Sequence, residues 1–421
     1  MRAIISTSVL VLSLSLSVAA QHQNSRISLN VNLYEGVDQS FYSKSTFGTK
    51  NPVYGAFPVT SMLRHNRVDG LFLGYQEDKM GWSRSDFLGI ESIDIHGMAG
   101  YSVAQQNFQY SIGAEKSIGN RHKWLLIGGQ MHSTTTTEDY WRTGLYENSI
   151  SSFAAGFDYH DYYKADGYGF YALIRPFQML EIGTSFNSDQ YSSLELNTDF
   201  ALISRYSTVR LNPAIDPNFD QIDQQSVTVG ATINPFMLTK SFISTTISAK
   251  AELAGIGGFE NDFSYNKWQL ESKSSLRLDN STVVKWRFMA GVITGQAPMF
   301  KEFALGGIGS MRAFGYKSMQ GNQMLMSNFE MQFGKSSHYQ NGWPDLKSTY
   351  LTLFLDSGTS SFNHALTSSG NPISDFDISF SEFSHNVGVG LGLGAVRFEV
   401  AQPIYGSGGM TTFWIRLNPS F

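Results

Sequence analysis

The residues best suited to chemistry lie in a glycine-rich stretch of the C-terminal third. The segment LGGIGSMRAFGY (Leu305–Tyr316) places Gly306 and Gly307 ahead of a lone arginine, Arg312, among small and aromatic residues. A phosphate-binding loop, a tight turn and an inward-folding loop of a membrane protein can each have such a sequence. The glycines do not follow the G-x-G-x-x-G spacing, and no strand–helix–strand unit is predicted around them. The pattern therefore disfavours a phosphate or dinucleotide site.

Other catalytic signatures are missing from the sequence. There is no G-x-S-x-G elbow, no H-E-x-x-H zinc pair and no Walker A sequence. The chain has no cysteine, which excludes disulfides, thiolate metal ligands and cysteine nucleophiles. The nine histidines are scattered, and the cluster HDYY (His160–Tyr163) is more typical of a strand end at a membrane interface than of a catalytic pair. We expect a non-enzymatic protein without cofactor or metal, although a nucleophile assembled from distant residues stays open.

Composition narrows the class of protein further. The net charge is −5 and the pI is about 6.0, so nothing attracts the chain to nucleic acid. Charged residues make up only 15% of the 421 residues, aromatic residues 14%, and there are 40 glycines. The mean hydropathy of −0.17 excludes a helical membrane protein.

The N-terminus has the features of a secretory signal peptide over residues 1–20. Arg2 precedes an apolar run that ends in Val18-Ala19-Ala20, where small residues suit cleavage after Ala20. No later stretch supplies the roughly 20 apolar residues that a membrane helix needs. An exported chain rich in glycine and aromatic residues fits an outer-membrane β-barrel of a Gram-negative-type bacterium, exported by the Sec pathway.

Alternation of polar and apolar residues supports the barrel. In KWQLESKSSLRL (267–278) the charged residues share one face, and Trp268, Leu270, Leu276 and Leu278 share the other. A soluble β-sandwich also alternates, but charges on the polar face and strands of about ten to fourteen residues favour tilted membrane strands around a wet lumen. We expect an all-β fold, a transmembrane antiparallel β-barrel of sixteen strands.

The expected strands are 67–80, 92–103, 108–119, 122–137, 150–160, 166–177, 179–190, 224–236, 241–255, 263–278, 281–294, 322–333, 348–357, 384–393, 395–404 and 411–418. Residues 67–421 would form the barrel, and residues 21–66 a periplasmic tail, a plug or part of the first strand. Long connections at 191–223, 295–321 and 358–383 would lie at the extracellular rim. The segments 138–149 and 334–347 would be periplasmic turns, and loop 295–321 would fold into the lumen.

The strands after Leu305–Tyr316 place acids beside the glycine-rich loop. In NFEMQF (328–333) Glu330 alternates with phenylalanine and methionine, and in YLTLFLDS the leucines face lipid, which turns Asp356 inward. Two acids in a confined space repel unless a cation joins them. The planar fork of Arg312 can bridge two carboxylates, and flanking glycines let its loop turn sharply. We expect a loop lock of Arg312, Glu330 and Asp356.

These segments, in this order and spacing, resemble the barrel of the BamA/TamA superfamily, also called the bacterial surface antigen family. The loop arginine of that family matches Arg312, its lumen glutamate matches Glu330 and its Asp-x-Gly matches Asp356. The pair on the penultimate strand matches Arg397 and Glu399. The loop tip and turn correspond to Gly306, Gly307, Phe314, Gly315 and Tyr316, where Arg-Ala-Phe-Gly-Tyr replaces the family's Arg-Gly-Tyr.

The chain ends TTFWIRLNPSF, in which Phe413, Ile415, Leu417 and Phe421 share one face. This ending is similar to the signal that the barrel assembly machinery recognises. Fewer than fifty residues separate Ala20 from Arg67, so we expect a form that lacks the family's periplasmic POTRA modules. In relatives the first and last strands meet in a weak seam, which the resemblance places here at 67–80 and 411–418.

The resemblance implies a function in inserting, translocating or exporting protein or lipid across the outer membrane. The expected partners are outer-membrane lipid and lipopolysaccharide, the barrel assembly machinery during biogenesis, and a separate periplasmic or lipoprotein partner, with no nucleic acid. A passive pore, a structural surface antigen and an outer-membrane lipid hydrolase remain as alternatives.

Overall fold

The structure is a computed structural model of the chain. It describes residues 63–77, 93–118, 125–177, 179–203, 209–234, 242–334, 348–368, 370–417 and 419. The predicted signal peptide and all but the end of segment 21–66 lie outside the described residues, as does Phe421.

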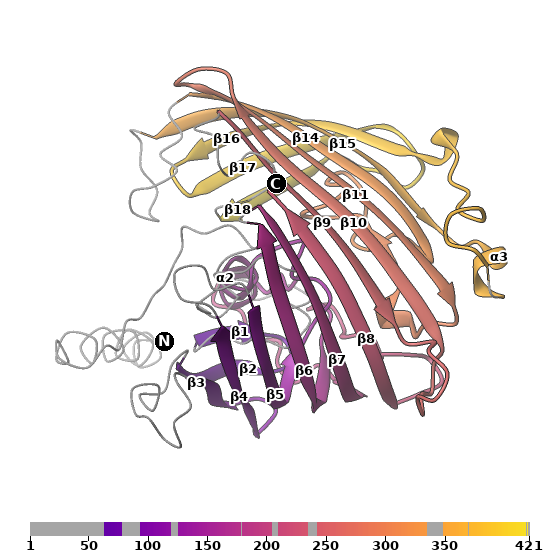
Figure 1. Ribbon diagram of the computed structural model, residues 1–421. Helices are drawn as coiled ribbons and strands as arrows, with labels where there is room; N and C mark the ends of the chain where they lie inside the picture. The colour runs from indigo at the N-terminus through magenta and orange to yellow at the C-terminus, as the bar shows by residue number, and fades with distance from the viewer. Residues whose placement is uncertain are drawn as a thin grey trace, which may run out of the picture. The chain divides into compact units, whose positions relative to one another are not determined.

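The fold is a sixteen-stranded antiparallel β-barrel sheet in which neighbouring strands follow one another along the chain (Figure 1). The predicted fold class is therefore confirmed. The strands are β1 (Leu63–Asn66), β2 (Gly70–Glu77), β3 (Ile93–Ser102), β4 (Asn107–Ile118), β5 (Leu125–Thr136), β6 (Tyr163–Phe177), β7 (Leu180–Ser193), β8 (Gln221–Ile233), β9 (Ile243–Leu253), β10 (Tyr265–Arg277), β11 (Thr282–Gly295), β14 (Gln323–Gly334), β15 (Thr349–Ser361), β16 (Ser384–Leu393), β17 (Val396–Tyr405) and β18 (Thr412–Leu417).

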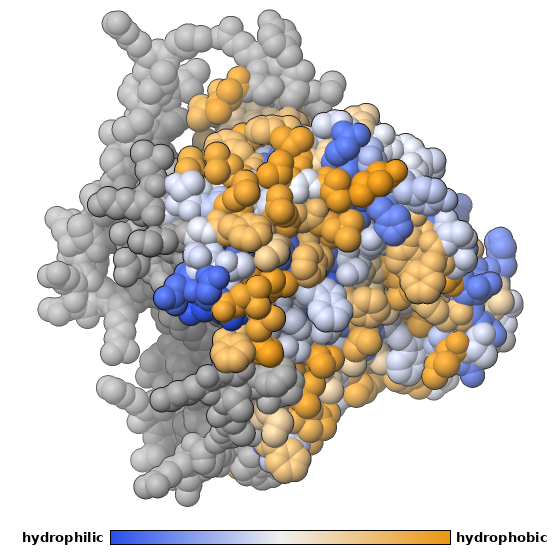
Figure 2. All heavy atoms as spheres, turned by 90° about the horizontal axis from the view of Figure 1, so that it is seen from above, coloured by the Kyte–Doolittle hydropathy of each residue, from blue (hydrophilic) through white to orange (hydrophobic). Residues whose placement is uncertain are grey.

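Alternation along the strands produces an apolar outer face and a polar inner face. On β15, Leu351, Leu353 and Leu355 are 40–47% exposed, whereas Thr352 and Asp356 between and beside them are fully buried. Figure 2 shows one face of the molecule, on which apolar side chains predominate with polar ones among them. Because successive side chains on a strand point to opposite faces, the polar residues of β15 point inward.

One predicted strand was wrong, and one strand was missing from the prediction. Residues 150–160 are not a strand, because helix α2 occupies Leu145–Ala155 and ends at Gly156, whose φ of 74° forms a left-handed cap. The barrel also begins before residue 67, since β1 pairs with β2 through the tight turn at 67–69. One strand too many and one too few leave the predicted count of sixteen correct.

The same correction changes the rim to which segment 138–149 belongs. It is part of the connection 137–162 between β5 and β6, which we call loop L3. Because consecutive strands are antiparallel, L3 lies at the same rim as the connection 194–220 and the connection 296–322, which we call loop L6. Segment 138–149 therefore lies at the rim predicted to be extracellular, not at the rim predicted to carry the periplasmic turns.

L6 has structure of its own. It contains the short helix η4 (Met299–Lys301) and a two-stranded sheet of β12 (Phe303–Leu305) and β13 (Met319–Gly321). The connection after β15 contains the short helices α3 (His364–Thr367) and η5 (Phe380–Glu382). Of the helices in the described ranges, none has the length and apolarity to cross a membrane.

The two ends of the sheet are β1 and β18. Each pairs with one neighbour, β2 and β17 respectively, and no ladder joins β1 to β18 in the described part of the chain. Phe413 and Ile415 on β18 are 61% and 55% exposed and lie on the outer face.

Candidate functional site

Glycines shape L6 so that its tip turns sharply. Gly306 and Gly309 have φ angles of 110° and 72°, which residues with a side chain rarely adopt. A Cβ on Gly306 would lie 2.1 Å from the carbonyl oxygen of Gly315, and a Cβ on Gly309 would lie 2.0 Å from that of Arg142. The backbone therefore packs closely both within L6 and against L3. Arg312 lies at the tip of L6.

Arg312 binds three carboxylates on three strands. Its Nε and Nη2 donate to Asp356 on β15, at 2.8 Å each, in a two-point pairing. Its Nη1 donates to Glu330 on β14 at 2.9 Å and to Glu399 on β17 at 3.3 Å. All four side chains are at most 1% exposed. The structure thus brings together the residues predicted to form the loop lock.

Arg397 completes the arrangement from β17. It donates to both oxygens of Glu330, at 2.9 Å and 3.0 Å, and pairs with Glu399. Two guanidinium groups therefore face three carboxylates. Arg397 and Glu399 thus extend the three-residue loop lock predicted from the sequence. From here on the name loop lock covers all five side chains, Arg312, Glu330, Asp356, Arg397 and Glu399.

Asp356 also accepts hydrogen bonds from neutral side chains. Asn328 and Asn386 each donate to it at 2.8 Å, and Asn328 also donates to the Ser310 carbonyl of L6. The guanidinium of Arg312 lies 3.5 Å above the ring of Phe354. Buried charges are tolerated when they are paired and hydrogen-bonded, as here.

The tip of L6 is also attached to the last strand. The backbone carbonyl of Arg312 accepts hydrogen bonds from Thr412 at 2.7 Å and from Trp414 at 3.0 Å. Phe314 is buried and forms an isolated β-bridge with Gly409, in the hairpin that leads into β18. The loop lock therefore reaches from β14 to the end of the sheet.

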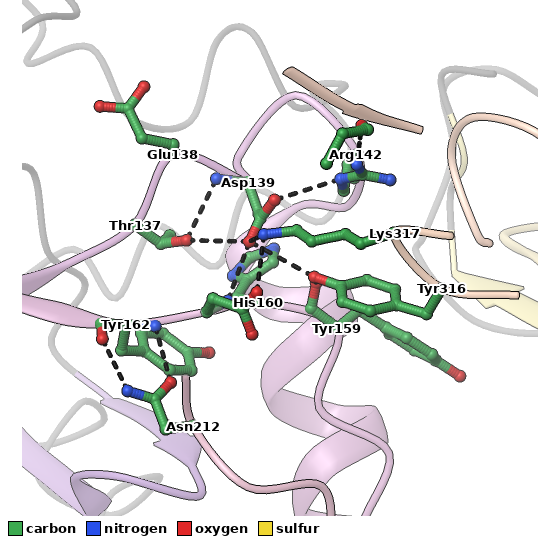
Figure 3. A network of polar contacts seen from close by, with 12 residues as sticks. Thr137, Glu138, Asp139, Arg142, Tyr159, His160, Tyr162, Asn212, Tyr316 and Lys317 are labelled. Carbon is green, nitrogen blue, oxygen red and sulfur yellow. Dashed lines mark hydrogen bonds and ion pairs between the residues drawn. The ribbon is translucent and has the colours of Figure 1, made fainter. Parts of the chain in front are cut away.

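A second group of contacts joins L6 to L3 and was not predicted from the sequence (Figure 3). Lys317 Nζ lies 2.8 Å from Asp139 and 2.7 Å from Asp161. The Tyr316 hydroxyl donates to the Tyr159 carbonyl at 2.7 Å. We call this group the rim network; its members are Asp139, Arg142, Tyr159, Asp161, Arg210, Tyr316 and Lys317.

Arginines hold the rim network from two sides. Arg142 of L3 donates to Asp139 at 3.1 Å and to the Gly306 carbonyl at 3.1 Å. Arg210, in the connection 194–220, pairs with Asp161 at 2.5 Å and lies over the Tyr316 ring. The segment HDYY thus contributes Asp161 to a structural network at the rim.

Burial and charge set the protonation of two groups in L3. Burial alone would raise the pKa of Asp139, but Lys317 and Arg142 outweigh it and hold that pKa well below its usual range. Burial lowers the pKa of His160, although Asp139 and Asp158 act in the opposite direction. His160 contacts the Thr143 hydroxyl at 2.9 Å. In the described ranges no three acidic or histidine side chains are grouped to hold a metal ion.

A third ionic group lies beside the base of L6. Lys301 pairs with Glu138 of L3 at 2.7 Å and with Glu252 of β9 at 3.1 Å. Lys267 of β10 donates to the Lys301 carbonyl at 2.7 Å. Three groups of contacts therefore hold L6: the ion pairs of Lys301 at its base, the rim network, and the loop lock at its tip.

Fold and site together define a class: a β-barrel of outer-membrane type, with one loop held inside by buried ion pairs. The chain belongs to the family of unknown function DUF5686, whose C-terminal domain model matches residues 39–300. A search of the curated proteins finds no match.

Solved barrels align with this chain at low sequence identity. BamA from Haemophilus ducreyi lacking POTRA domains 1–3 is 13% identical, with a TM-score of 0.51 over 84% of this chain and 68% of that one. CdiB from Escherichia coli is 12% identical, with a TM-score of 0.45 over 84% of this chain and 61% of that one. CdiB from Acinetobacter baumannii is 8% identical, with a TM-score of 0.41 over 86% and 60%. The chain thus spans about three fifths of each CdiB chain.

Proposed function

We propose that this protein is an outer-membrane barrel related to the BamA/TamA superfamily, and that it helps to insert, translocate or export protein or lipid across that membrane. The role is non-enzymatic. Export by the Sec pathway, assembly by the barrel assembly machinery and contact with lipid and lipopolysaccharide belong to the proposal. So does a separate periplasmic or lipoprotein partner.

The observation that carries the proposal is the combination of a locked inner loop with a sheet whose end strands, β1 and β18, share no ladder in the described part of the chain. Every other neighbouring pair of strands exchanges backbone hydrogen bonds. Separating β1 from β18 breaks no described ladder, only the contacts that helix α2 makes with the two strands. We therefore expect it to cost less than parting any other pair of strands. Meanwhile the loop lock ties β14, β15 and β17 together, so opening is directed to the seam between β1 and β18.

A passive pore is the rival reading, and the interior of the barrel supports it less well. L6, L3 and the loop lock place fully buried side chains across the interior. Planar-bilayer recording separates the two functions. A large and steady conductance that is unchanged by Arg312→Ala favours the passive pore, whereas small or intermittent conductance favours a closed barrel that opens at its seam.

The experiment that tests the function uses the absence of native cysteines. Cysteines in β1 and in β18 are joined by a bifunctional reagent whose spacer is long enough to span helix α2, and the protein is reconstituted in proteoliposomes. The readout is insertion of a urea-unfolded outer-membrane barrel protein, together with transfer of labelled lipid. We expect the cross-link to block whichever of these two activities the protein shows before cross-linking. Reduction of a cleavable reagent should restore that activity.

A matched control joins two strands away from the seam. Thr245 on β9 and Ser274 on β10 have hydroxyls 3.1 Å apart, so the Thr245→Cys/Ser274→Cys pair cross-links neighbours that already share a ladder. That variant should keep its activity. Equal activity in the seam-linked and control proteins would refute a seam that opens.

A further inference from the structure

Helix α2 of L3 lies between the two ends of the sheet, β1 and β18 (Figure 1). It contacts both of them through side chains that accept hydrogen bonds from strand backbone. A strand at the edge of a sheet presents unpaired N–H groups, and each such group is costly to leave unsatisfied in a membrane. The helix therefore lies between two end strands that share no ladder among the described residues.

On the β1 side the contact is made by two serines. The backbone N–H of His65 donates to the Ser149 hydroxyl at 2.6 Å, and the His65 ring contacts the Ser152 hydroxyl at 3.0 Å. Phe153 of α2 meets the His65 ring edge-on, with 5.5 Å between centroids. The N–H of His65 is thus satisfied by the helix instead of by a strand.

On the β18 side the contact is made by one carboxylate. Glu147 accepts from the backbone N–H of Leu417 at 3.0 Å and from Arg416 Nε at 2.7 Å. Glu147 is 6% exposed and Arg416 is 1% exposed. One turn of α2 therefore supplies hydrogen-bond acceptors to both β1 and β18, the first and last strands of the sheet.

The buried residues of α2 are mostly polar. They are Glu147, Asn148 and Ser152, together with Leu145. Its outer side includes Ile150, and Phe157 follows just after the helix; these are 46% and 56% exposed. A surface helix of a soluble protein places polar residues outside. Lipid-facing strands of this barrel, such as β15, have the same apolar-out order as α2.

The chain beside α2 extends this apolar surface. Leu202 and Ile203, in the connection 194–220, donate their backbone N–H groups to carbonyls of Phe153 and Ala154 at 3.0 Å and 2.9 Å. Their side chains are 58% and 77% exposed. The exposed apolar residues of this surface, which we call the seam patch, are Ile150, Phe157, Phe200, Leu202 and Ile203.

We propose that α2 completes the barrel wall between β1 and β18, and that the seam patch contacts the acyl chains of the membrane. The wall is then fifteen strand-to-strand ladders plus one helix. The occupant is lipid because the exposed apolar face of α2 adjoins β1, whose Leu63 is 45% exposed on the same outer belt as Leu73 of β2. This inference rests on the proposed membrane location.

The test measures the surroundings of single cysteines in an otherwise cysteine-free chain. Ile150→Cys is labelled with a nitroxide and reconstituted in phosphatidylcholine vesicles. Collision with oxygen, which concentrates in acyl chains, is compared with collision with a water-soluble nickel chelate. Leu353→Cys on β15 is the lipid-facing control, and Ile373→Cys, an exposed apolar residue of the connection after β15, is the water-facing control.

We expect the oxygen-to-nickel ratio of Ile150→Cys to match that of Leu353→Cys and to exceed that of Ile373→Cys several-fold. If Ile150→Cys matches Ile373→Cys, α2 faces water and the inference is wrong while the membrane location stands. If Leu353→Cys itself behaves like Ile373→Cys, the membrane location fails. Phe157→Cys gives a second reading at the other end of the seam patch, should Ile150→Cys prevent folding.

Discussion

Replacing Arg312 by alanine is the sharpest test of the loop lock. The substitution removes two hydrogen bonds to Asp356, one to Glu330 and one to Glu399. Glu330 and Glu399 keep Arg397 as a partner. Asp356 keeps only neutral donors among its described contacts, namely Asn328, Asn386 and the backbone N–H of residue 312. Most of the loss therefore falls on Asp356.

The expected cost follows from that asymmetry. Breaking a buried ion pair by removing one partner costs about 3–5 kcal/mol, because a charge is left uncompensated. Four separate charge-assisted bonds at about 1.5–3 kcal/mol each would sum to more, but they share one guanidinium and two of the acids stay paired. We therefore expect the free energy of unfolding to fall by about 3–5 kcal/mol.

Two measurements check this value. Urea unfolding in detergent micelles, followed by tryptophan fluorescence, gives the free energy of unfolding. Semi-native gels give the temperature at which the folded barrel is lost, which should fall for Arg312→Ala. Limited proteolysis adds a local readout, because L6 should become cleavable before the strands do.

A control and a double mutant decide whether the reasoning holds. Arg277→Ala removes an exposed arginine of β10 and should change stability by about 0.5 kcal/mol or less. Asp356→Asn removes the charge opposite Arg312, so the double mutant Arg312→Ala/Asp356→Asn should cost clearly less than the sum of the single mutants. Additive losses, or unchanged stability and L6 protection in Arg312→Ala, would refute the loop lock.

Three further predictions concern L6. Lys317→Met leaves Asp139 without its ammonium partner and should destabilise the rim network by about 1–3 kcal/mol, seen as faster proteolysis of L6. Gly309→Ala forces a side chain into a left-handed backbone against a carbonyl, and should lower the unfolding temperature through a cost of about 1–3 kcal/mol. Burial and Asp216 raise the pKa of Glu302 from 4.5 to about 7, so L6 loses stability as pH rises between these values. Glu302→Gln should remove that decline in protease protection between pH 5 and 8, and an unchanged pH profile would contradict it.

The strands and the loop lock were the parts of the structure most accessible from sequence. Alternation fixes which residues of β15 point inward, so Asp356 could be placed in the lumen from the exposed leucines beside it. The arginine that neutralises it was predictable because L6 carries a single arginine between glycines. The roles assigned to these residues stay predictions.

Helix α2 and the rim network could not be found in the same way. The segment that forms α2 has buried polar and exposed apolar side chains, so its pattern resembles neither a soluble helix nor a clean strand. Asp139 and Lys317 are 178 residues apart, and their pairing depends on how two loops fold over one rim. Gly156 ends α2, but strands such as β16 also contain glycines, so this glycine did not distinguish helix from strand.

The attachment of Arg312 to the end of the chain has a consequence for how the protein is built. Its carboxylate partners come from β14, β15 and β17, and its carbonyl is bonded by Thr412 and Trp414 of β18. The bonds to Glu399, Thr412 and Trp414 cannot form until the last hairpin of the chain is in place. Contacts of such long sequence separation form late because loop closure must come first. Full docking of L6 therefore requires the C-terminal strands. In a chain halted before β17, Arg312 would lack Glu399, and the tip of L6 would lack its bonds to β18.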